Sequence, residues 1–321
     1  MHKPYFIIDF DSTFITLEGL DELAKIALKQ NPNRKKIVSQ IEEITKLGME
    51  GKISFPESLQ KRLELFQPSQ ENIDQLIKLL KKNITSSVAR NKKFFKENSS
   101  QIYVISGGFT DYIWPVVKKF GVEQTHILAN SFKFDKKGLV IGIDITKPLA
   151  QIQGKVKQVK QLKLSGEVIV IGDGITDYEI RQHNLAQKFI AFTENASREA
   201  VAKKADMVVQ NFDEILFSLS LPRAISYPKN KMKVLLLENI DKNAADYFKK
   251  QGYSVETLKT ALDEKELAEK IKNVSILGIR SKTEVTKTVL EQAKKLYAVG
   301  AFCIGTNQID LEVATKKGVA V

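Results

Sequence analysis

Three short runs of apolar residues, each followed at once by small or acidic residues, constrain the fold of this chain most. The runs cover residues 5–8, 102–105 and 168–171, and each is continuous rather than alternating. Continuous runs rich in β-branched and aromatic residues are typical of strands buried on both faces of a parallel sheet. Sites in open parallel sheets lie beyond the carboxyl ends of the strands. We therefore expect the polar residues after the three runs to meet at one edge.

Those polar residues are the groups that a phosphoryl-transfer site needs. Two carboxylates at positions i and i+2 of an extended segment point to the same side. Two negative charges at such a short distance repel each other unless they share a cation or a proton. Mg²⁺ would satisfy them, because it prefers carboxylate oxygens together with water and phosphate. Glycine amides and a hydroxyl suit phosphate oxygens, and a lysine ahead of the third run adds positive charge. The residues are Asp9 and Asp11 after the first run, Ser106, Gly107 and Gly108 after the second, Lys155, and Asp173 and Asp177 after the third.

The stretch between the first two runs has helical periodicity. Apolar residues at Leu20, Leu23, Ala24 and Ala27 follow the i, i+3, i+4, i+7 pattern. We expect a helical cap over about residues 16–80, inserted into the sheet domain. A hairpin is predicted over 132–140, and further parallel strands at 188–192 and 206–209. The predicted fold class is α/β, with a Rossmann-like parallel-sheet core and a helical cap insertion.

A second domain is predicted after a break in the pattern. Pro222, Pro228 and Asn230 interrupt the chain around residues 218–231. We expect a first domain over residues 1–222, a linker over 223–231 and a second domain over 232–321. The second domain reads as a βα series of flavodoxin-like α/β type that is incomplete. Its predicted strands lie at 233–237, near 255 and at 275–279, with a helix at 242–251, and the last residues, 318–321, read as the start of another strand.

Composition excludes several classes of protein. The net charge is +12, but the lysines are spread along helical segments without interleaved aromatics, which favours a solvated surface over a nucleic-acid site. The single cysteine, Cys303, excludes an internal disulfide framework and a cysteine metal site. No apolar stretch approaches about 18 residues, and Asp9 and Asp11 interrupt the apolar start. We expect a cytoplasmic protein without nucleic-acid or membrane partners.

The polar clusters, taken in order, resemble the four motifs of the haloacid-dehalogenase-like phosphatases. The first part of the chain, about residues 4–217, more narrowly resembles the phosphoserine phosphatases of that family. The general motifs are Asp9-Phe10-Asp11-Ser12-Thr13, Ser106-Gly107-Gly108, Lys155 and Gly172-Asp173-Gly174-Ile175-Thr176-Asp177. The narrower resemblance rests on Glu18-Gly19-Leu20-Asp21-Glu22-Leu23-Ala24 and on Met49-Glu50-Gly51-Lys52, followed by Phe55, Ser58-Leu59 and Arg62.

The resemblance implies a covalent mechanism with Mg²⁺ as cofactor. Asp9 would attack phosphorus and form an aspartyl-phosphate, and Lys155 would offset the charge of the phosphate. Asp11 would protonate the leaving oxygen and then take a proton from water, while its backbone carbonyl binds the metal. Asp9 and Asp173 would ligate Mg²⁺ directly, and Asp177 would support them.

The resemblance also implies a substrate, O-phosphoserine, and with it the last step of serine biosynthesis. Glu18 would meet the amino group and Arg62 the carboxylate, which a planar guanidinium can bind at two points. The alternative is another small phosphomonoester. Val156 departs from the family, which often has glycine after the lysine, and a branched residue there could displace Lys155. Ser106 would be a catalytic residue that holds the phosphoryl oxygens together with the Gly107 amide. The further substrate-binding residues would be Gly108 and Thr176, with Met49 and Phe55 in an apolar lid.

The second domain resembles the beginning of the D-3-phosphoglycerate dehydrogenases. The resemblance rests on residues 277–283 and 299–310, and it implies that Arg280, Ser281 and Asn307 lie at an anionic substrate. No Gly-x-Gly-x-x-Gly fingerprint follows residue 231, so we expect no dehydrogenase activity from these residues. The chain thus reads as a phosphatase fused to about the first quarter of a dehydrogenase. Alternatively, the second domain is a binding or assembly module, through which the chain could form a homo-oligomer.

Overall fold

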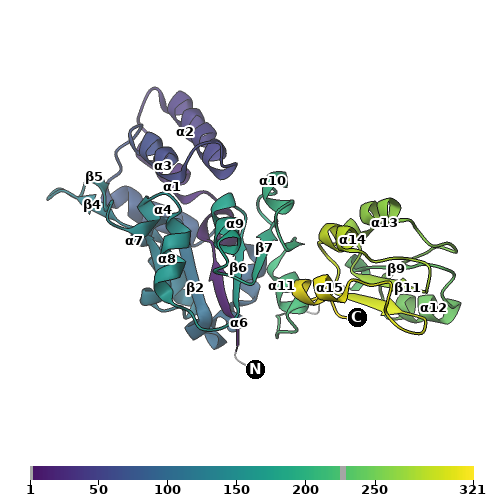
Figure 1. Ribbon diagram of the computed structural model, residues 1–321. Helices are drawn as coiled ribbons and strands as arrows, with labels where there is room; N and C mark the ends of the chain where they lie inside the picture. Colours follow the sequence, from purple (N-terminus) through teal and green to yellow (C-terminus); the bar gives the residue numbers. More distant parts are fainter. Residues whose placement is uncertain (1–2, 225–228) are drawn as a thin grey trace. The chain divides into compact units, whose positions relative to one another are not determined.

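The computed structural model describes residues 3–224 and 229–321, which form two compact units (Figure 1). Among these residues the first unit takes 3–205, 209–215 and 222–224, and the second takes 206–208, 216–221 and 229–321. The linker predicted over 223–231 lies in part outside the described residues. None of the described helices is both long and apolar enough to cross a membrane.

A six-stranded sheet in the order β3-β2-β1-β6-β7-β8 forms the core of the first unit, although Met207 and Val208 of β8 are grouped with the second unit. Numbered along the sheet's own strands, this is the order 3-2-1-4-5-6 of doubly wound folds, so the predicted Rossmann-like α/β class is confirmed. The pairs that β1 forms with β2 and β6 are parallel, which brings the carboxyl ends of these three strands together. The strands are β1 (Tyr5–Ile8), β2 (Ile102–Phe109), β3 (Ile127–Asn130), β6 (Val168–Gly172), β7 (Lys188–Phe192) and β8 (Met207–Val209).

The strand β2 is longer than the apolar run that predicts it. Its last residues include Ser106, Gly107 and Gly108, so the polar cluster lies within the strand rather than after it. The strand continues because Phe109 still pairs with Asn130 of β3, after a shift of register that follows Ile105. The cluster is nevertheless at the carboxyl end of β2, beside the end of β1.

The chain after β1 differs from the extended segment predicted there. Residues Phe10–Phe14 form a wide turn, η1, which the amide of Ile15 closes by donating to the carbonyl of Phe10 at 3.0 Å. Asp11 keeps extended backbone angles, but Ser12 has a φ of 50° in the left-handed region. The turn therefore sends the carboxylates of Asp9 and Asp11 to different partners.

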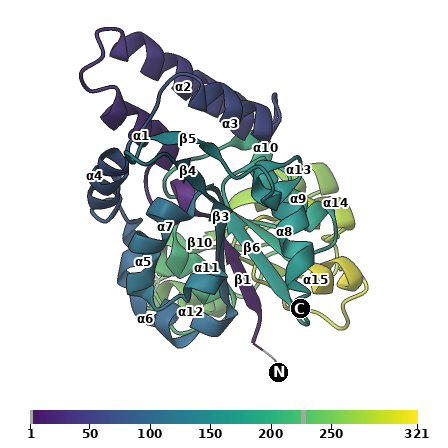
Figure 2. The ribbon, with the colours of Figure 1, turned by 90° about the vertical axis from the view of Figure 1, so that its left-hand side faces the viewer.

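The helical cap region holds four helices. Local signals start two of them, because the Ser54 side chain caps α3 with Pro56 in its first turn, and Ser69 forms a capping box at α4. In both ribbon views α2 and α3 lie beyond the carboxyl ends of the strands (Figure 2). The helices are α1 (Gly19–Ala27), α2 (Arg34–Met49), α3 (Phe55–Leu63) and α4 (Gln70–Leu80).

The rest of the first unit packs around the sheet. The predicted hairpin is present as the antiparallel pair β4 (Phe132–Phe134) and β5 (Val140–Ile143). Strand β1, in the middle of the sheet, is covered over most of its length: Ile7 and Ile8 are both 0% exposed, whereas Tyr5 at its start is partly buried. The remaining helices are α5 (Ser86–Arg90), α6 (Lys92–Glu97), α7 (Thr110–Val117), α8 (Gly154–Leu162), α9 (Ile175–Gln182), α10 (Glu199–Ala202) and α11 (Phe212–Ser218), with short turns η2 (Ser99–Gln101), η3 (Lys118–Phe120), η4 (Gln124–His126) and η5 (Pro148–Ala150).

The second unit has a four-stranded parallel sheet in the order β10-β9-β11-β12. This is the order 2-1-3-4 with which a flavodoxin-like sheet begins. The strand predicted at 318–321 is a single bridge: Ala320 pairs with Ala298 at the edge of β12. The elements are η6 (Lys229–Lys231), β9 (Lys233–Leu236), α12 (Lys242–Lys250), β10 (Ser254–Thr257), α13 (Glu264–Lys270), η7 (Ile271–Asn273), β11 (Ile276–Ile279), α14 (Lys287–Gln292), β12 (Ala298–Ala301) and α15 (Leu311–Lys317).

Candidate active site

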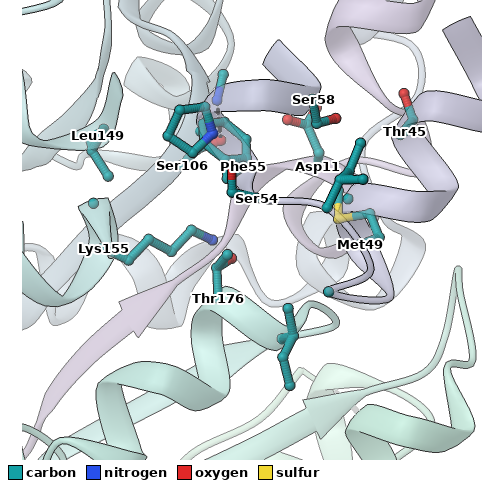
Figure 3. A pocket seen from close by; sticks show the side chains of 18 of the residues that line it. Asp11, Thr45, Met49, Ser54, Phe55, Ser58, Ser106, Leu149, Lys155 and Thr176 are labelled. Atoms are coloured by element: carbon teal, nitrogen blue, oxygen red, sulfur yellow. Dashed lines mark hydrogen bonds between the residues drawn. The ribbon is translucent and has the colours of Figure 1, made fainter. Parts of the chain in front are cut away.

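A cavity of about 410 Å³ lies at the carboxyl ends of β1 and β2, with the cap helices on its other side. In Figure 3 Lys155 reaches into it from α8, and Met49 and Phe55 enter from the cap. The cavity brings together residues that are far apart in the sequence. Those that the sequence predicts and that line it are Asp9, Asp11, Glu18, Met49, Phe55, Arg62, Ser106, Gly107, Gly108, Lys155 and Thr176.

Lys155 joins the first and third motifs. Its Nζ lies 2.9 Å from Asp9 Oδ2 and 2.8 Å from Asp177 Oδ1. Burial by itself lowers the pKa of Lys155, but the charges of Asp177 and Asp9 outweigh it and raise that pKa above its ordinary value. The lysine is thus a permanent cation beside Asp9, and Val156 does not displace it.

Three buried carboxylates meet next to this lysine. Oxygen atoms of Asp9, Asp173 and Asp177 all lie within 4.8 Å of one another. Asp173 also accepts from the Thr13 hydroxyl at 3.0 Å. Burial, and after it the charge of Asp9, raise the pKa of Asp177 to about 7. Buried carboxylate oxygens are the donors that hard divalent cations take, so the cluster fits a metal ion of that kind. That the backbone carbonyl of Asp11 is also a metal ligand stays a prediction.

The raised pKa of Asp177 has a consequence for stability. The unfolded chain releases this proton near the ordinary value of 3.8, whereas the folded chain keeps it to about 7. The contribution of Asp177 to the free energy of unfolding is therefore complete below 3.8 and declines as the pH rises to about 7. We expect the difference in the free energy of unfolding between the wild type and Asp177→Asn, both measured in EDTA, to become smaller as the pH rises through this window. Urea denaturation at a series of pH values measures it, and a difference independent of pH would contradict it.

Asp11 is tied to the start of the cap. Its Oδ1 accepts from the amide of Gly19, the first residue of α1, at 2.7 Å. Burial, then the charges of Glu18 and Asp9, raise the pKa of Asp11 well above its usual range. A raised pKa makes a carboxyl group better suited to hold a proton and to donate it. Glu18 itself accepts from the Ser12 hydroxyl at 2.6 Å.

Arg62 is held in place by groups that sequence reasoning missed. The side chain is 6% exposed; Nε donates to the Ser58 carbonyl at 3.2 Å, and Nη1 donates to Thr45 Oγ1 at 3.2 Å and to Asp21 Oδ1 at 3.4 Å. Thr45 in turn donates to Asp21 at 2.7 Å. These contacts connect α1, α2 and α3. In the sequence Asp21 is only an acidic residue in a first helical turn, and nothing there signals its burial.

Arg198 is a second residue that the sequence did not single out. It forms an ion pair with Asp173, and its Nη2 lies 3.5 Å from Glu18 Oε1. It thereby links the carboxylate cluster to the cap side of the cavity. Arg198 lies between β7 and α10, outside every motif, so neither spacing nor periodicity could have found it.

The three candidates of the second unit are exposed and are not among the residues that line the cavity. Arg280 and Ser281 follow β11, and Asn307 follows β12. The amides of Arg280, Lys282 and Thr283 all donate to the carboxylate of Glu238, at 3.0, 2.9 and 3.0 Å. These three amides are therefore already occupied and are not available to bind an anion.

Comparison with known proteins agrees with the division of the chain into two units. Residues 6–180 match the haloacid dehalogenase-like hydrolases, and residues 234–321 match the catalytic domain of the D-isomer specific 2-hydroxyacid dehydrogenases. The chain is 35% identical over 214 residues to the phosphoserine phosphatase of Homo sapiens, covering 66% of this chain and 91% of that protein. It is 53% identical over 96 residues to the D-3-phosphoglycerate dehydrogenase of Dictyostelium discoideum, covering 30% of this chain and 24% of that protein. The chain thus spans only about a quarter of that dehydrogenase's length.

Solved structures point the same way. A phosphoserine phosphohydrolase-like protein from Francisella tularensis is 31% identical, with a TM-score of 0.61, over 67% of this chain and 99% of that one. A phospho-aspartyl intermediate analogue of phosphoserine phosphatase is 25% identical, with a TM-score of 0.54, over 69% and 100%. The chain belongs to the haloacid dehalogenase-like hydrolases, as a phosphomonoester hydrolase of the phosphoserine phosphatase group that continues into a segment of the 2-hydroxyacid dehydrogenase family.

Proposed function

We propose that this chain hydrolyses O-phosphoserine to serine and phosphate through an aspartyl-phosphate, as the last step of serine biosynthesis. One observation carries the choice of substrate: the buried Arg62 lines the same cavity as Asp9 and Lys155. A cavity lined by both a nucleophilic carboxylate and a guanidinium suits a phosphomonoester that also bears a carboxylate. The relatives named phosphoserine phosphatase support this choice, and the relationship of the second unit to D-3-phosphoglycerate dehydrogenases supports the pathway.

In the first step an oxygen of Asp9 attacks phosphorus, and the bond from phosphorus to the serine oxygen breaks. Lys155, 2.9 Å from Asp9, offsets the repulsion between the carboxylate and the phosphate. The Ser106 hydroxyl and the Gly107 amide hold the phosphoryl oxygens, with Gly108 and Thr176 beside them. Asp11, whose pKa burial raises, gives its proton to the departing serine oxygen.

In the second step water hydrolyses the aspartyl-phosphate. Asp11, now a carboxylate, takes a proton from the water as its oxygen bonds to phosphorus. The bond from phosphorus to the Asp9 oxygen breaks, and Asp9 is restored. The hydrogen bond from the Gly19 amide keeps Asp11 in one place for both proton transfers.

The metal of this reaction is proposed to be Mg²⁺. Asp9 and Asp173 would hold it with the backbone carbonyl of Asp11, and Asp177 would support them. Bound there, it would supply charge neutralisation for the phosphoryl group. The cluster of buried carboxylates supports this proposal.

The cap is proposed to select the amino acid. Arg62 would bind the carboxylate of the substrate and Glu18 its amino group, while Met49 and Phe55 exclude water. The fixed position of Arg62, between Ser58, Thr45 and Asp21, supports this role because it prepares the guanidinium before the substrate arrives.

A substitution at Arg62 tests the substrate. We expect Arg62→Lys to lower kcat/KM for phosphoserine by about 1–3 kcal/mol in transition-state binding, because lysine cannot bind a carboxylate at two points. Hydrolysis of a small aryl phosphate, which has no such carboxylate, should change much less. Phosphate release from both substrates measures the effect. As a control, Lys61→Arg alters an exposed cation one residue away and should alter neither rate.

Two results would decide against the proposal. Equal losses on both substrates in Arg62→Lys would mean that the arginine supports the cap and does not read the substrate. A wild-type protein that prefers another small phosphomonoester to phosphoserine would favour the alternative substrate class.

A further inference from the structure

The hydroxyl of Tyr112 is a buried donor that the mechanism above does not use. Tyr112, in the first half of α7, is 0% exposed, yet it is among the residues that line the active-site cavity. Among the described residues no group accepts a hydrogen bond from its Oη, although the backbone of Phe109 lies close enough to lower the pKa of the phenol. Buried polar groups are nearly always paired, so an unpaired hydroxyl at the wall of a binding cavity points to a partner that arrives with the ligand.

Two glycines fix where this hydroxyl lies. A Cβ on Gly108 would come within 2.6 Å of Tyr112 Oη and 3.2 Å of Ser106 Oγ. A Cβ on Gly19 would lie 2.9 Å from Cε2 of the same ring and 3.0 Å from Asp11 Oδ1. The ring is therefore wedged between the end of β2 and the start of α1. Its hydroxyl lies next to the phosphoryl-binding strand and close to Asp11.

The charged groups around Tyr112 include both cap residues proposed to bind the amino acid, Glu18 and Arg62, as well as Asp11. Burial, and after it the charge of Asp11, raise the pKa of Tyr112 well above its usual range, while Arg62 and Glu18 act on it in opposite directions. The phenol therefore stays protonated and can donate. Arg62 is the one cation among the groups that act on Tyr112, so an anionic group of the substrate is favoured on its side of the cavity.

We propose that Tyr112 Oη donates a hydrogen bond to the substrate carboxylate that Arg62 binds, and so takes part in selecting the substrate. This inference rests on the proposed function, because it requires a substrate with a carboxylate. The phosphoryl group has its own donors in Lys155, Ser106 and Gly107. Tyr112 adds a neutral donor, which recognises a carboxylate without adding a further buried charge.

The test compares two substrates that differ only in the carboxylate, phosphoserine and phosphoethanolamine. We expect Tyr112→Phe to lower kcat/KM for phosphoserine about tenfold or more, mostly through KM, as one hydrogen bond to a charged group is lost. Its effect on phosphoethanolamine should stay within about twofold. Because the free protein leaves the hydroxyl unpaired, the melting temperature of Tyr112→Phe should be unchanged or higher. Tyr103→Phe, in β2 and outside the cavity lining, serves as the matched control.

Each other outcome overturns the inference. A clear drop in melting temperature would mean that the hydroxyl is paired within the free protein, through a bound water or otherwise. Equal losses on the two substrates would assign Tyr112 to the phosphoryl group, and no loss on either would leave it without a ligand. A failure of the proposed function looks different, because the wild-type protein itself would then show no preference for phosphoserine over phosphoethanolamine.

Discussion

Asp9→Asn should lower phosphate release from phosphoserine at least about 10³-fold, which is about 4 kcal/mol in the barrier. The amide is isosteric with the carboxylate but cannot form the bond to phosphorus that the mechanism requires. The substitution also removes the negative charge that Lys155 faces at 2.9 Å. Steady-state assays of phosphate release measure the effect. Acid quenching of the reaction, which would trap a phosphorylated protein, supports them.

The first control for this variant is a measurement of whether it still folds. Asp9 is one of three clustered carboxylates, so its neutralisation removes repulsion at the same time as it removes an ion pair. We therefore expect the melting temperature of Asp9→Asn to stay close to that of the wild type. Asp74→Asn, at an exposed site in α4, should keep full activity. Near wild-type turnover by Asp9→Asn would show that Asp9 is not the nucleophile.

Removal of divalent metal should abolish activity to a similar extent. Without a metal cation, the buried carboxylates of the cluster repel the phosphate. The nearby positive partners of Asp9, Asp173 and Asp177 are then Lys155 and Arg198. EDTA should therefore stop phosphate release, and added Mg²⁺ should restore it. Binding should also stabilise the fold, by about 2.7 kcal/mol when Mg²⁺ is present at 100 times its Kd.

A variant separates metal binding from inhibition by the chelator itself. Asp173→Asn should weaken Mg²⁺ binding in calorimetry and lose most of the Mg²⁺-dependent rise in melting temperature. Asp213→Asn is the matched control, since Asp213 is equally buried but pairs with Arg90 outside the cavity; it should keep the response to Mg²⁺ even if it is less stable. If calorimetry detects no Mg²⁺ binding to the wild-type protein, the proposed metal site is wrong.

Much of the fold could be read from local patterns. The runs at 5–8 and 188–192 coincide with β1 and β7, because a strand buried on both faces needs a continuous apolar run. The end of β2 could not be predicted, since Ser106, Gly107 and Gly108 look like a turn in isolation. Only pairing of Phe109 with Asn130 in β3 keeps these residues in the strand.

The candidate site was predictable as far as its motifs reach. Asp9, Ser106 and Lys155 each follow or precede an apolar run at a position that parallel topology brings to one edge. The side chains that contact Arg62 were not predictable, although one of them belongs to a motif of the narrower resemblance. The partners that fix Arg62, namely Asp21 and Thr45, belong to different helices, and whether a helical residue faces solvent or a neighbouring helix depends on the packing of the cap.

Local sequence patterns were enough to predict the α/β class and the order of the reacting groups, because apolar periodicity and strand-end chemistry are local properties. The tertiary structure alone decided which charges pair. It ties Asp11 to the Gly19 amide, sets Arg198 against Asp173, and buries the hydroxyl of Tyr112 between two glycines. The free energy of each contact depends on burial and distance, which no local pattern encodes.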